Sequence, residues 1–409
     1  MRVYRPPRIV QDGLWSLLTN GGSKVFALGQ VVWAGQAGGS ETLGIYALGS
    51  SLALLGMSVA DFGFALKATR AAAISRGRVD FRAVFVQFRR RVVACFALVL
   101  VGAAVYGALF DSIAVPVALL AAAYGAAYLA AHFIAAFARG LRMFREAAVV
   151  VGSVRTGAVV LSGSAVLFPE HAAELLLGVA VLTETTIALL LFRRVEERRP
   201  QLDSPGAPLT GGSVAFGVAA ILNTAVNRSD AALVGSVTTL SEVGTYSAAS
   251  QVENAVTTAA VAPSDAIVTH SAQAAAGDTA HQHYRQALGA SLALAVVLCV
   301  VTAAVTILFL PRLIGIPDVV GPTLAVLIGT PAGVAASVAL SHLSGLGRGR
   351  EIVVVWLGTA VVAVPLMLLL AGQLGAMGAA YAAVGRDLFL MAGACGAVAY
   401  VRRDGGTAV

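Results

Sequence analysis

The sequence predicts an all-α integral membrane protein, with about twelve transmembrane helices arranged in two six-helix lobes. Three observations lead to this prediction. Hydrophobic residues make up 58% of the chain and charged residues only 12%, whereas a soluble domain carries roughly 25% charged residues. The apolar residues gather in stretches of about 20, the length that a helix needs to cross a bilayer core. Short motifs of the first half recur in the second half.

Each expected span of the first half is an apolar stretch bounded by charged residues. The first span follows Arg2, Arg5 and Arg8 and is longer than the apolar core of a signal peptide, so we expect an uncleaved helix. Glu41 and Asp111 mark later turns. The six spans expected here are 12–34, 43–66, 92–110, 115–137, 147–168 and 172–192.

A proline-containing segment separates the halves. It includes Pro200, Pro205 and Pro208, and prolines break helices, so we expect a linker at 200–210 between lobes 1–199 and 211–409. Glu242 and Asp318 then mark turns between apolar stretches. The six spans expected here are 211–236, 244–268, 286–309, 320–343, 352–371 and 374–398.

The basic residues predict the orientation in the membrane. Most of the 28 Lys and Arg residues fall in loops on the side of the two termini, four lie within the spans, and the opposite loops hold only Arg312. By the positive-inside rule, both termini are expected to be cytoplasmic. This distribution also accounts for the net charge of +7 without nucleic acid as a partner.

Two segments of the first half recur in the second half. Residues 140–150 match 345–355 at Gly, Leu, Arg, Glu and two Val positions, and Ser40-Glu41 with Gly44 and Tyr46 matches Ser241-Glu242 with Gly244 and Tyr246. Because six is even, the two halves share one orientation, which is the parallel repeat of many alternating-access transporters.

These segments carry a family resemblance. Gly44-Ile45-Tyr46-Ala47, Ala60-Asp61-Phe62-Gly63 and Gly244-Thr245-Tyr246-Ser247 resemble Wzx-type polysaccharide flippases of the multidrug/oligosaccharidyl-lipid/polysaccharide (MOP) exporter superfamily. The resemblance implies two bundles around a central cavity, lined mainly by the first two spans of each half. It also implies a bacterial inner-membrane location and transport of lipid-linked sugar to the outer leaflet.

Polar residues align on the spans that would line this cavity. They recur at helical spacing, which places them on one face of each helix. Interhelical hydrogen bonding is the alternative reading of such stripes. The candidate substrate-binding residues are Lys24, Arg228, Asn20, Asn223, Asn227, Gln251 and Asn254.

Several charged residues within the spans have two interpretations, because a charge in a bilayer is costly and is retained for pairing or function. Arg155 and Glu184 lie at matched depth, which favours an ion pair between neighbouring helices. Asp230 is the expected partner of Arg228, and Asp387 that of Arg386. Asp61, Asp230 and Glu184 are also candidates for carrying a coupling proton.

The sequence favours a transporter over an enzyme. The resemblance and the basic interior indicate a flippase for an undecaprenyl-pyrophosphate-linked oligosaccharide, with membrane lipids and polysaccharide polymerase or other assembly proteins as further partners. A multidrug or cation antiporter of the same fold is the alternative, although Lys24 argues against cationic cargo. A membrane glycosyltransferase or polymerase is a third reading, but the short outer loops hold no clustered acids. No metal, cofactor or nucleotide site is expected.

Overall fold

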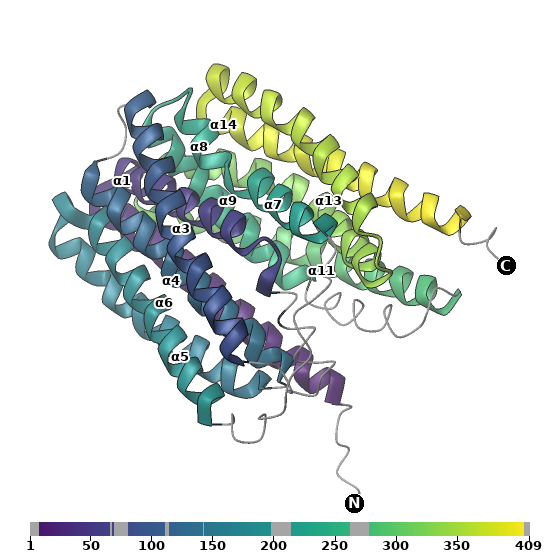
Figure 1. Ribbon diagram of the computed structural model, residues 1–409. Helices are drawn as coiled ribbons and strands as arrows, with labels where there is room; N and C mark the ends of the chain where they lie inside the picture. Colours follow the sequence, from purple (N-terminus) through teal and green to yellow (C-terminus); the bar gives the residue numbers. More distant parts are fainter. Residues whose placement is uncertain are drawn as a thin grey trace, which may run out of the picture.

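The computed structural model describes residues 8–65, 68, 81–110, 114–141, 143–197, 214–261 and 278–404. The linker expected at 200–210 lies outside the described residues. Within these ranges the regular structure is helical (Figure 1), as the composition predicts.

The helices of the first half follow the expected spans closely. They are α1 (Arg8–Asp61), α3 (Phe81–Phe110), α4 (Val115–Gly140), α5 (Phe144–Ser162) and α6 (Ala172–Glu197), with short 3₁₀ turns η1 (Gly163–Leu167) and η2 (Pro169–His171) before α6. The helix α3 begins eleven residues before the expected span at 92, because its amphipathic, Arg-rich first turns continue the helix beyond the apolar stretch.

The second half contains the corresponding helices. They are α7 (Val214–Arg228), α8 (Asp230–Gly235), α9 (Leu240–Val261), α11 (Asp278–Leu308), α12 (Leu310–Ile314), η5 (Pro317–Val319), α13 (Val320–Gly345) and α14 (Gly349–Asp404). One expected span, 211–236, is a broken helix, since α7 and α8 are separated at Ser229.

Two long helices each contain two crossings. The helix α1 turns at Gly38 and Gly39, and α14 turns at Gly375. Gly39 and Gly375 have φ angles of 68° and 59°, a region that glycine adopts without the strain of a side chain. The turn at Gly38 and Gly39 falls in the loop expected between 34 and 43, whereas the turn at Gly375 lies just inside the span expected from 374.

The crossings account for the predicted membrane fold. Eight helices of the described part are long and apolar enough to span a membrane, and α1 and α14 are among them. The broken α7–α8 helix and the polar α9 complete the set. The all-α membrane fold with about twelve crossings in two lobes is therefore confirmed. The helix α7 is only 15 residues long because the break at Ser229 divides this crossing, and α9 is less apolar because it carries polar residues of the interior.

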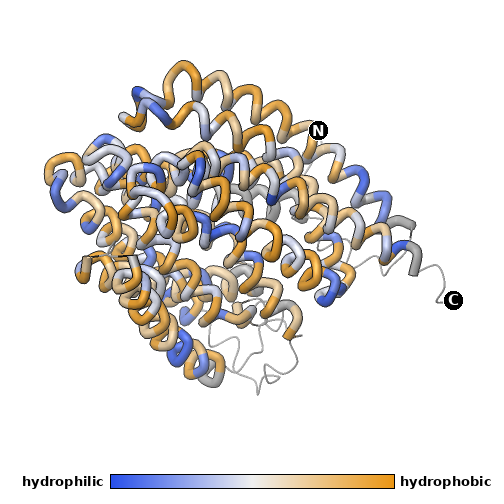
Figure 2. Tube along the Cα trace, turned by 90° about the horizontal axis from the view of Figure 1, so that it is seen from above, coloured by the Kyte–Doolittle hydropathy of each residue, from blue (hydrophilic) through white to orange (hydrophobic). Residues whose placement is uncertain are grey.

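The outer surface has the character expected in contact with lipid. Val93, Val101 and Leu109 on α3 are 65%, 61% and 70% exposed, and Val300 on α11 is 65% exposed. Large exposed apolar surfaces are rare on soluble monomers. Figure 2 shows hydrophobic residues along most of the helices, with hydrophilic segments at several helix ends.

The two lobes meet at one end of the molecule and diverge toward the other. They converge near α8 and the turns of α1 and α14, and they separate toward the end where α1 begins and α14 ends (Figure 1). The contact end includes apolar packing across the lobes, in which Leu43 and Tyr46 of α1 share a core with Val252 of α9 and Ile314 of α12. Among the described residues, the lobes are therefore packed together at one end and lie apart at the end where α1 begins and α14 ends.

Candidate transport cavity

Two adjoining chambers lie between the lobes. The first has a volume of about 420 Å³ and is walled mainly by α1, α4, α5 and α6, with Arg228 and Gln251 from the second lobe. The second has a volume of about 580 Å³ and is walled mainly by α7, α9, α13 and α14. Leu54, Tyr128 and Arg228 line both. We call them the basic chamber and the amide chamber.

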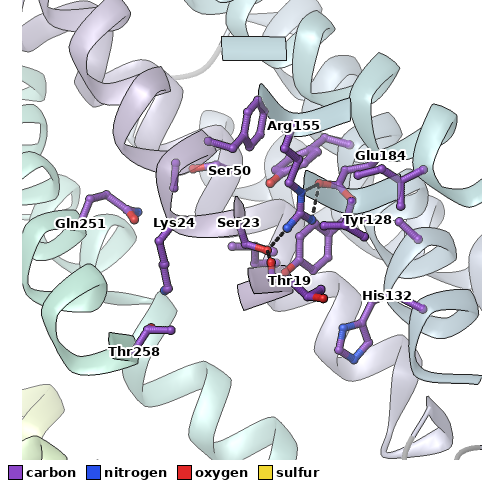
Figure 3. Close-up of a pocket in the computed structure, with 18 of the residues that line it drawn as sticks. Thr19, Ser23, Lys24, Ser50, Tyr128, His132, Arg155, Glu184, Gln251 and Thr258 are labelled. Atoms are coloured by element: carbon purple, nitrogen blue, oxygen red, sulfur yellow. Dashed lines mark hydrogen bonds and ion pairs between the residues drawn. The ribbon is translucent and has the colours of Figure 1, made fainter. Parts of the chain in front are cut away.

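Short hydroxyl side chains let α1 present a polar face inside the membrane. The hydroxyl of Thr19 donates to the carbonyl of Trp15 at 2.9 Å, and that of Ser23 donates to the carbonyl of Thr19 at 3.0 Å. Each hydroxyl is thereby satisfied by its own helix, which lowers the cost of burying it. Lys24 follows on the same wall and extends toward the α9 residues Gln251 and Thr258 (Figure 3).

Arg155 and Glu184 form an ion pair in the wall of the basic chamber. Nη2 of Arg155 lies 2.7 Å and Nε 3.1 Å from Oε1 of Glu184. Nη1 also donates to the hydroxyl of Ser23, so three helices meet at one guanidinium (Figure 3). Both side chains are buried, with residue exposures of 8% and 1%. This is the interhelical pairing that their matched depth in the sequence favours.

Among the described residues, no ion pair joins Lys24 or Arg228 to a carboxylate, so the basic chamber holds an excess of basic groups. Lys24, Arg155 and Arg228 are its cations, and Glu184 is the carboxylate among its described lining residues. A chamber of this kind attracts anions strongly, because charges interact more strongly where water is scarce.

The structure corrects the expected pairing of Arg228 with Asp230. Oδ2 of Asp230 instead lies 2.8 Å from Nη1 of Arg386 and accepts a hydrogen bond of 2.8 Å from the hydroxyl of Tyr246. Residues two positions apart on a helix do not face each other, and the break at Ser229 turns Asp230 further into the second lobe. Arg228 is left facing the cavity.

Arg386 is the centre of a buried ionic cluster in the second lobe. Its Nε lies 3.0 Å from Oδ1 of Asp387, as the adjacent positions predict, and its Nη2 lies 3.7 Å from Oε1 of Glu253. With Asp230, the cluster holds three carboxylates around one guanidinium. All four residues are less than 9% exposed, and Glu253, Arg386 and Asp387 border the amide chamber.

The remaining candidate residues divide between the two chambers. Asn223 and Asn227 lie one turn apart on α7 in the amide chamber, and Nδ2 of Asn227 donates to Oδ1 of Asn223 at 2.6 Å. Asn254 lines the same chamber, whereas Gln251 lines the basic one. The side chain of Asn20 lies outside the described residues.

Asp61 has a structural position instead. Its Oδ1 accepts a hydrogen bond of 3.0 Å from the backbone N–H of Ala65, and α1 ends at this residue. The guanidinium of Arg91 donates to the carbonyl oxygens of Ala60 and Asp61 at 2.7 and 2.8 Å. Asp61 is not among the described residues that line the two chambers. This geometry holds the end of the helix together.

The cavity is closed at the end where the lobes meet. Nε2 of Gln36 donates to the carbonyl oxygen of Leu313 at 2.8 Å, and the hydroxyls of Ser40 and Ser241 lie 2.6 Å apart. A Cβ at Gly44 would overlap the carbonyl oxygen of Leu240, and one at Gly244 would overlap that of Ser40. We call these contacts the closed end, and the contacts of Ser40, Gly44, Ser241 and Gly244 come from the repeated segments of the two halves.

Comparison with known proteins identifies the family. A sequence model described as polysaccharide biosynthesis protein matches residues 9–268, which is more than half of the chain. The chain belongs to this polysaccharide biosynthesis protein family. None of the curated proteins compared with it matches significantly.

This polysaccharide biosynthesis family member shares its fold with solved MATE transporters. A MATE structure in the straight conformation is 13% identical over 97% of this chain and 95% of that chain, with a TM-score of 0.63. A Vibrio cholerae MATE transporter is 14% identical over 97% and 96%, also at 0.63. An inward-facing multidrug resistance MATE transporter of the MOP superfamily is 13% identical over 94% and 96%, at 0.60. The chain thus has the fold of the solved MATE transporters and belongs by sequence to the polysaccharide biosynthesis protein family.

Sequence reasoning missed several residues that this family member places at its cavity. Glu253 lies beside the candidate Asn254 but points toward Arg386. It could have been identified from the sequence as an acidic residue within an expected span. Tyr128 faces both chambers and stacks on His132, with ring centroids 6.3 Å apart. Aromatic residues are common in buried spans, so no sequence pattern separates Tyr128 from a packing residue.

Proposed function

We propose that this transporter is a flippase that moves an undecaprenyl-pyrophosphate-linked oligosaccharide from the cytoplasmic to the outer leaflet by alternating access, for cell-surface polysaccharide synthesis. One observation carries the proposal. Lys24, Arg155 and Arg228 from both lobes surround the basic chamber, with Glu184 as the carboxylate of its described lining. A pyrophosphate is the anionic group of such a cargo, and charge-assisted contacts to phosphate are among the strongest polar interactions.

The three basic residues of the basic chamber differ in their pairing, and this difference supports a separate role for each. Arg155 pairs with Glu184 at 2.7 Å, so its guanidinium forms a fixed part of the chamber wall. Lys24 and Arg228 come from different lobes and are the proposed ligands of the pyrophosphate. Gln251 borders the same chamber and supplies a further hydrogen-bonding group.

The proposal includes an orientation and a division of the chain. Both termini face the cytoplasm, and residues 200–210 link the lobes 1–199 and 211–409. The interior opens on the side of the termini, so cargo enters from the cytoplasmic leaflet. An inside-negative potential favours outward movement of an anion by about 2.3 kcal/mol per charge per 100 mV. A polysaccharide polymerase on the outer side is the proposed consumer of the translocated cargo.

Reconstituted vesicles test the proposal directly. The full chain is placed in liposomes with a fluorescent prenyl-pyrophosphate disaccharide, and an impermeant reductant destroys the fluorophore in the outer leaflet. Liposomes with the protein are expected to lose nearly all fluorescence, because cargo from the inner leaflet is flipped outward, whereas protein-free liposomes keep about half. Equal protection in both preparations would refute the flippase function.

A cation antiporter is the second candidate function. It is favoured by the cluster of Asp230, Glu253 and Asp387, which holds three carboxylates for the single guanidinium of Arg386. Buried charges within a membrane often mark ion pathways. A transport assay with two cargoes separates the two candidates. An antiporter moves a lipophilic cation across the membrane in exchange for protons or sodium ions that move down their gradient, and it does not move the pyrophosphate lipid.

A further inference from the structure

The two chambers of the cavity differ in their charged groups. Lys24 and Arg155 line the basic chamber with Glu184, which pairs with Arg155, so basic groups exceed carboxylates there. In the amide chamber and directly behind it, Asp230, Glu253 and Asp387 surround Arg386, so carboxylates exceed cations. Arg228 stands at the boundary and lines both chambers. A cargo that fills the whole cavity therefore meets mainly basic groups at one end and a cluster rich in carboxyl groups at the other.

The lining of the amide chamber suits a polyhydroxylated molecule. Its described walls carry amide, hydroxyl and carboxylate groups, and the guanidinium groups of Arg228 and Arg386, which together donate to and accept from sugar hydroxyls. Trp356 adds an aromatic side chain to the same wall. The polar residues of this wall include Ser58, Asn223, Thr224, Asn227, Asn254 and Ser341. Its volume of about 580 Å³ lies in the range of ordinary ligand sites.

We propose that the cargo lies across both chambers, with its phosphate end in the basic chamber and its sugar end in the amide chamber, and that the sugar there is neutral or an amino sugar. This inference rests on the proposed flippase function and names the substrate class. A uronic acid would bring a further carboxylate beside Glu253 and Asp387, whereas a hydroxyl or amine donates hydrogen bonds to them. Like charges brought together at a desolvated site oppose binding strongly.

Three probes that share one prenyl chain test the proposal. They are the prenyl pyrophosphate without a sugar, its glucose conjugate and its glucuronate conjugate, and binding is measured on the full chain in nanodiscs. We expect the glucose probe to bind at least about tenfold more tightly than the glucuronate probe, the size of effect that a like-charge contact produces. Equal or tighter binding of the glucuronate probe would overturn the assignment of the sugar.

Matched substitutions separate the two chambers. Asn227→Ala should weaken the glucose probe several-fold and leave the sugar-free probe unchanged, whereas Lys24→Ala should weaken all three probes to the same extent. Glu253→Gln should narrow the difference between glucose and glucuronate, because it removes one repelling carboxylate. Ser153→Ala, on an exposed face of α5 and hydrogen-bonded to its own helix, is the control and should change none of the affinities.

The outcomes distinguish this inference from the proposed function. If the sugar-free probe does not bind, the pyrophosphate site and the flippase function fail together. If it binds but Asn227→Ala weakens it as much as the glucose probe, the phosphate end occupies the amide chamber and the proposed orientation is wrong, while the flippase function stands.

Discussion

The hydroxyl oxygen of Ser40 lies 2.6 Å from that of Ser241, its counterpart in the repeated segment of the second half. The contact joins the two lobes at the closed end, where Gly44 and Gly244 permit the backbones to approach. In an alternating-access transporter such a contact exists only in one conformation. The repeat thus supplies both sides of the closure.

A cysteine pair at these positions tests whether the contact must open. Ser40→Cys with Ser241→Cys, in a chain whose native cysteines are replaced, should form a disulfide under mild oxidation, because the side-chain oxygens already lie within bonding reach. A protease site in residues 200–210 reports the cross-link, since the halves then stay together after cleavage. Export should stop on oxidation and return with reductant. Full export by the cross-linked protein would show that this end never opens.

The second prediction concerns the glycines of the closed end, where an added side chain should favour opening. Gly244→Ala would place a Cβ against the carbonyl oxygen of Ser40, and a backbone atom cannot rotate away. Overpacking costs about 1–3 kcal/mol, which corresponds to a shift of roughly 5- to 150-fold between two conformations. A cysteine at Gln251 should then react faster with an impermeant thiol reagent applied at the closed end. Gly178→Ala is the control, because nothing lies within 4 Å of its added carbon.

The Arg155–Glu184 pair should behave as a buried ion pair. Removing either charge alone leaves the other buried and uncompensated, at a cost of about 3–5 kcal/mol, so Arg155→Met or Glu184→Gln should lower the amount of folded protein. The double substitution should recover much of it. Arg348 and Glu351 form the comparison, because that pair is partly exposed and its loss should cost only roughly 0.3–0.5 kcal/mol. A double mutant no better than the worse single mutant would contradict the coupling.

The cluster around Arg386 should respond unequally to its substitutions. Arg386→Met leaves three buried carboxylates without their cation and should reduce folded protein the most. Asp230→Asn loses contacts of 2.8 Å to both Arg386 and Tyr246, whereas Glu253→Gln loses a contact of 3.7 Å and relieves an excess of negative charge. Thermal unfolding in detergent should rank Glu253→Gln closest to the parent protein. The reverse ranking would mean that Glu253, rather than Asp230, neutralises Arg386.

Much of this fold could be predicted from the sequence, because a membrane imposes strong constraints on composition. Apolar length locates the crossings, and the repeated Ser-Glu and Gly-Leu-Arg segments reveal the two halves. The break at Ser229 was not predictable in the same way. It lies within an expected span without proline, and Asp230, the residue that follows it, bonds to Arg386, which is 156 residues away.

The candidate site was predictable in its parts rather than in its arrangement. Helical spacing identified Lys24, Asn223 and Asn254 as residues of polar faces, and the structure places each at the cavity. Sequence spacing carries no information about which helix lies opposite another. The separation into a basic and an amide chamber is therefore seen only in the structure, which places α4 beside the first chamber and α13 beside the second.

The last prediction concerns substitutions of Lys24 and Arg228, the proposed ligands of the pyrophosphate. Each contributes a cation from a different lobe to the basic chamber, and a charge-assisted contact is worth about 1.5–3 kcal/mol. Losing either should weaken cargo binding by roughly 10- to 150-fold. We expect Lys24→Ala and Arg228→Ala to reduce surface polysaccharide in a flippase-null strain while the protein accumulates normally in the membrane.

Conservative variants separate charge from packing at this site. Lys24→Arg keeps the charge in a different shape and should retain partial export, whereas Lys24→Met keeps most of the apolar stem, loses the charge and should behave like Lys24→Ala. Surface polysaccharide is measured for each variant and normalised to protein level. If Lys24→Met exports as well as the parent, the lysine serves packing. If the Lys24→Ala, Arg228→Ala double mutant complements fully, the basic chamber does not hold an anionic cargo, and the antiporter function becomes the better account of the cavity.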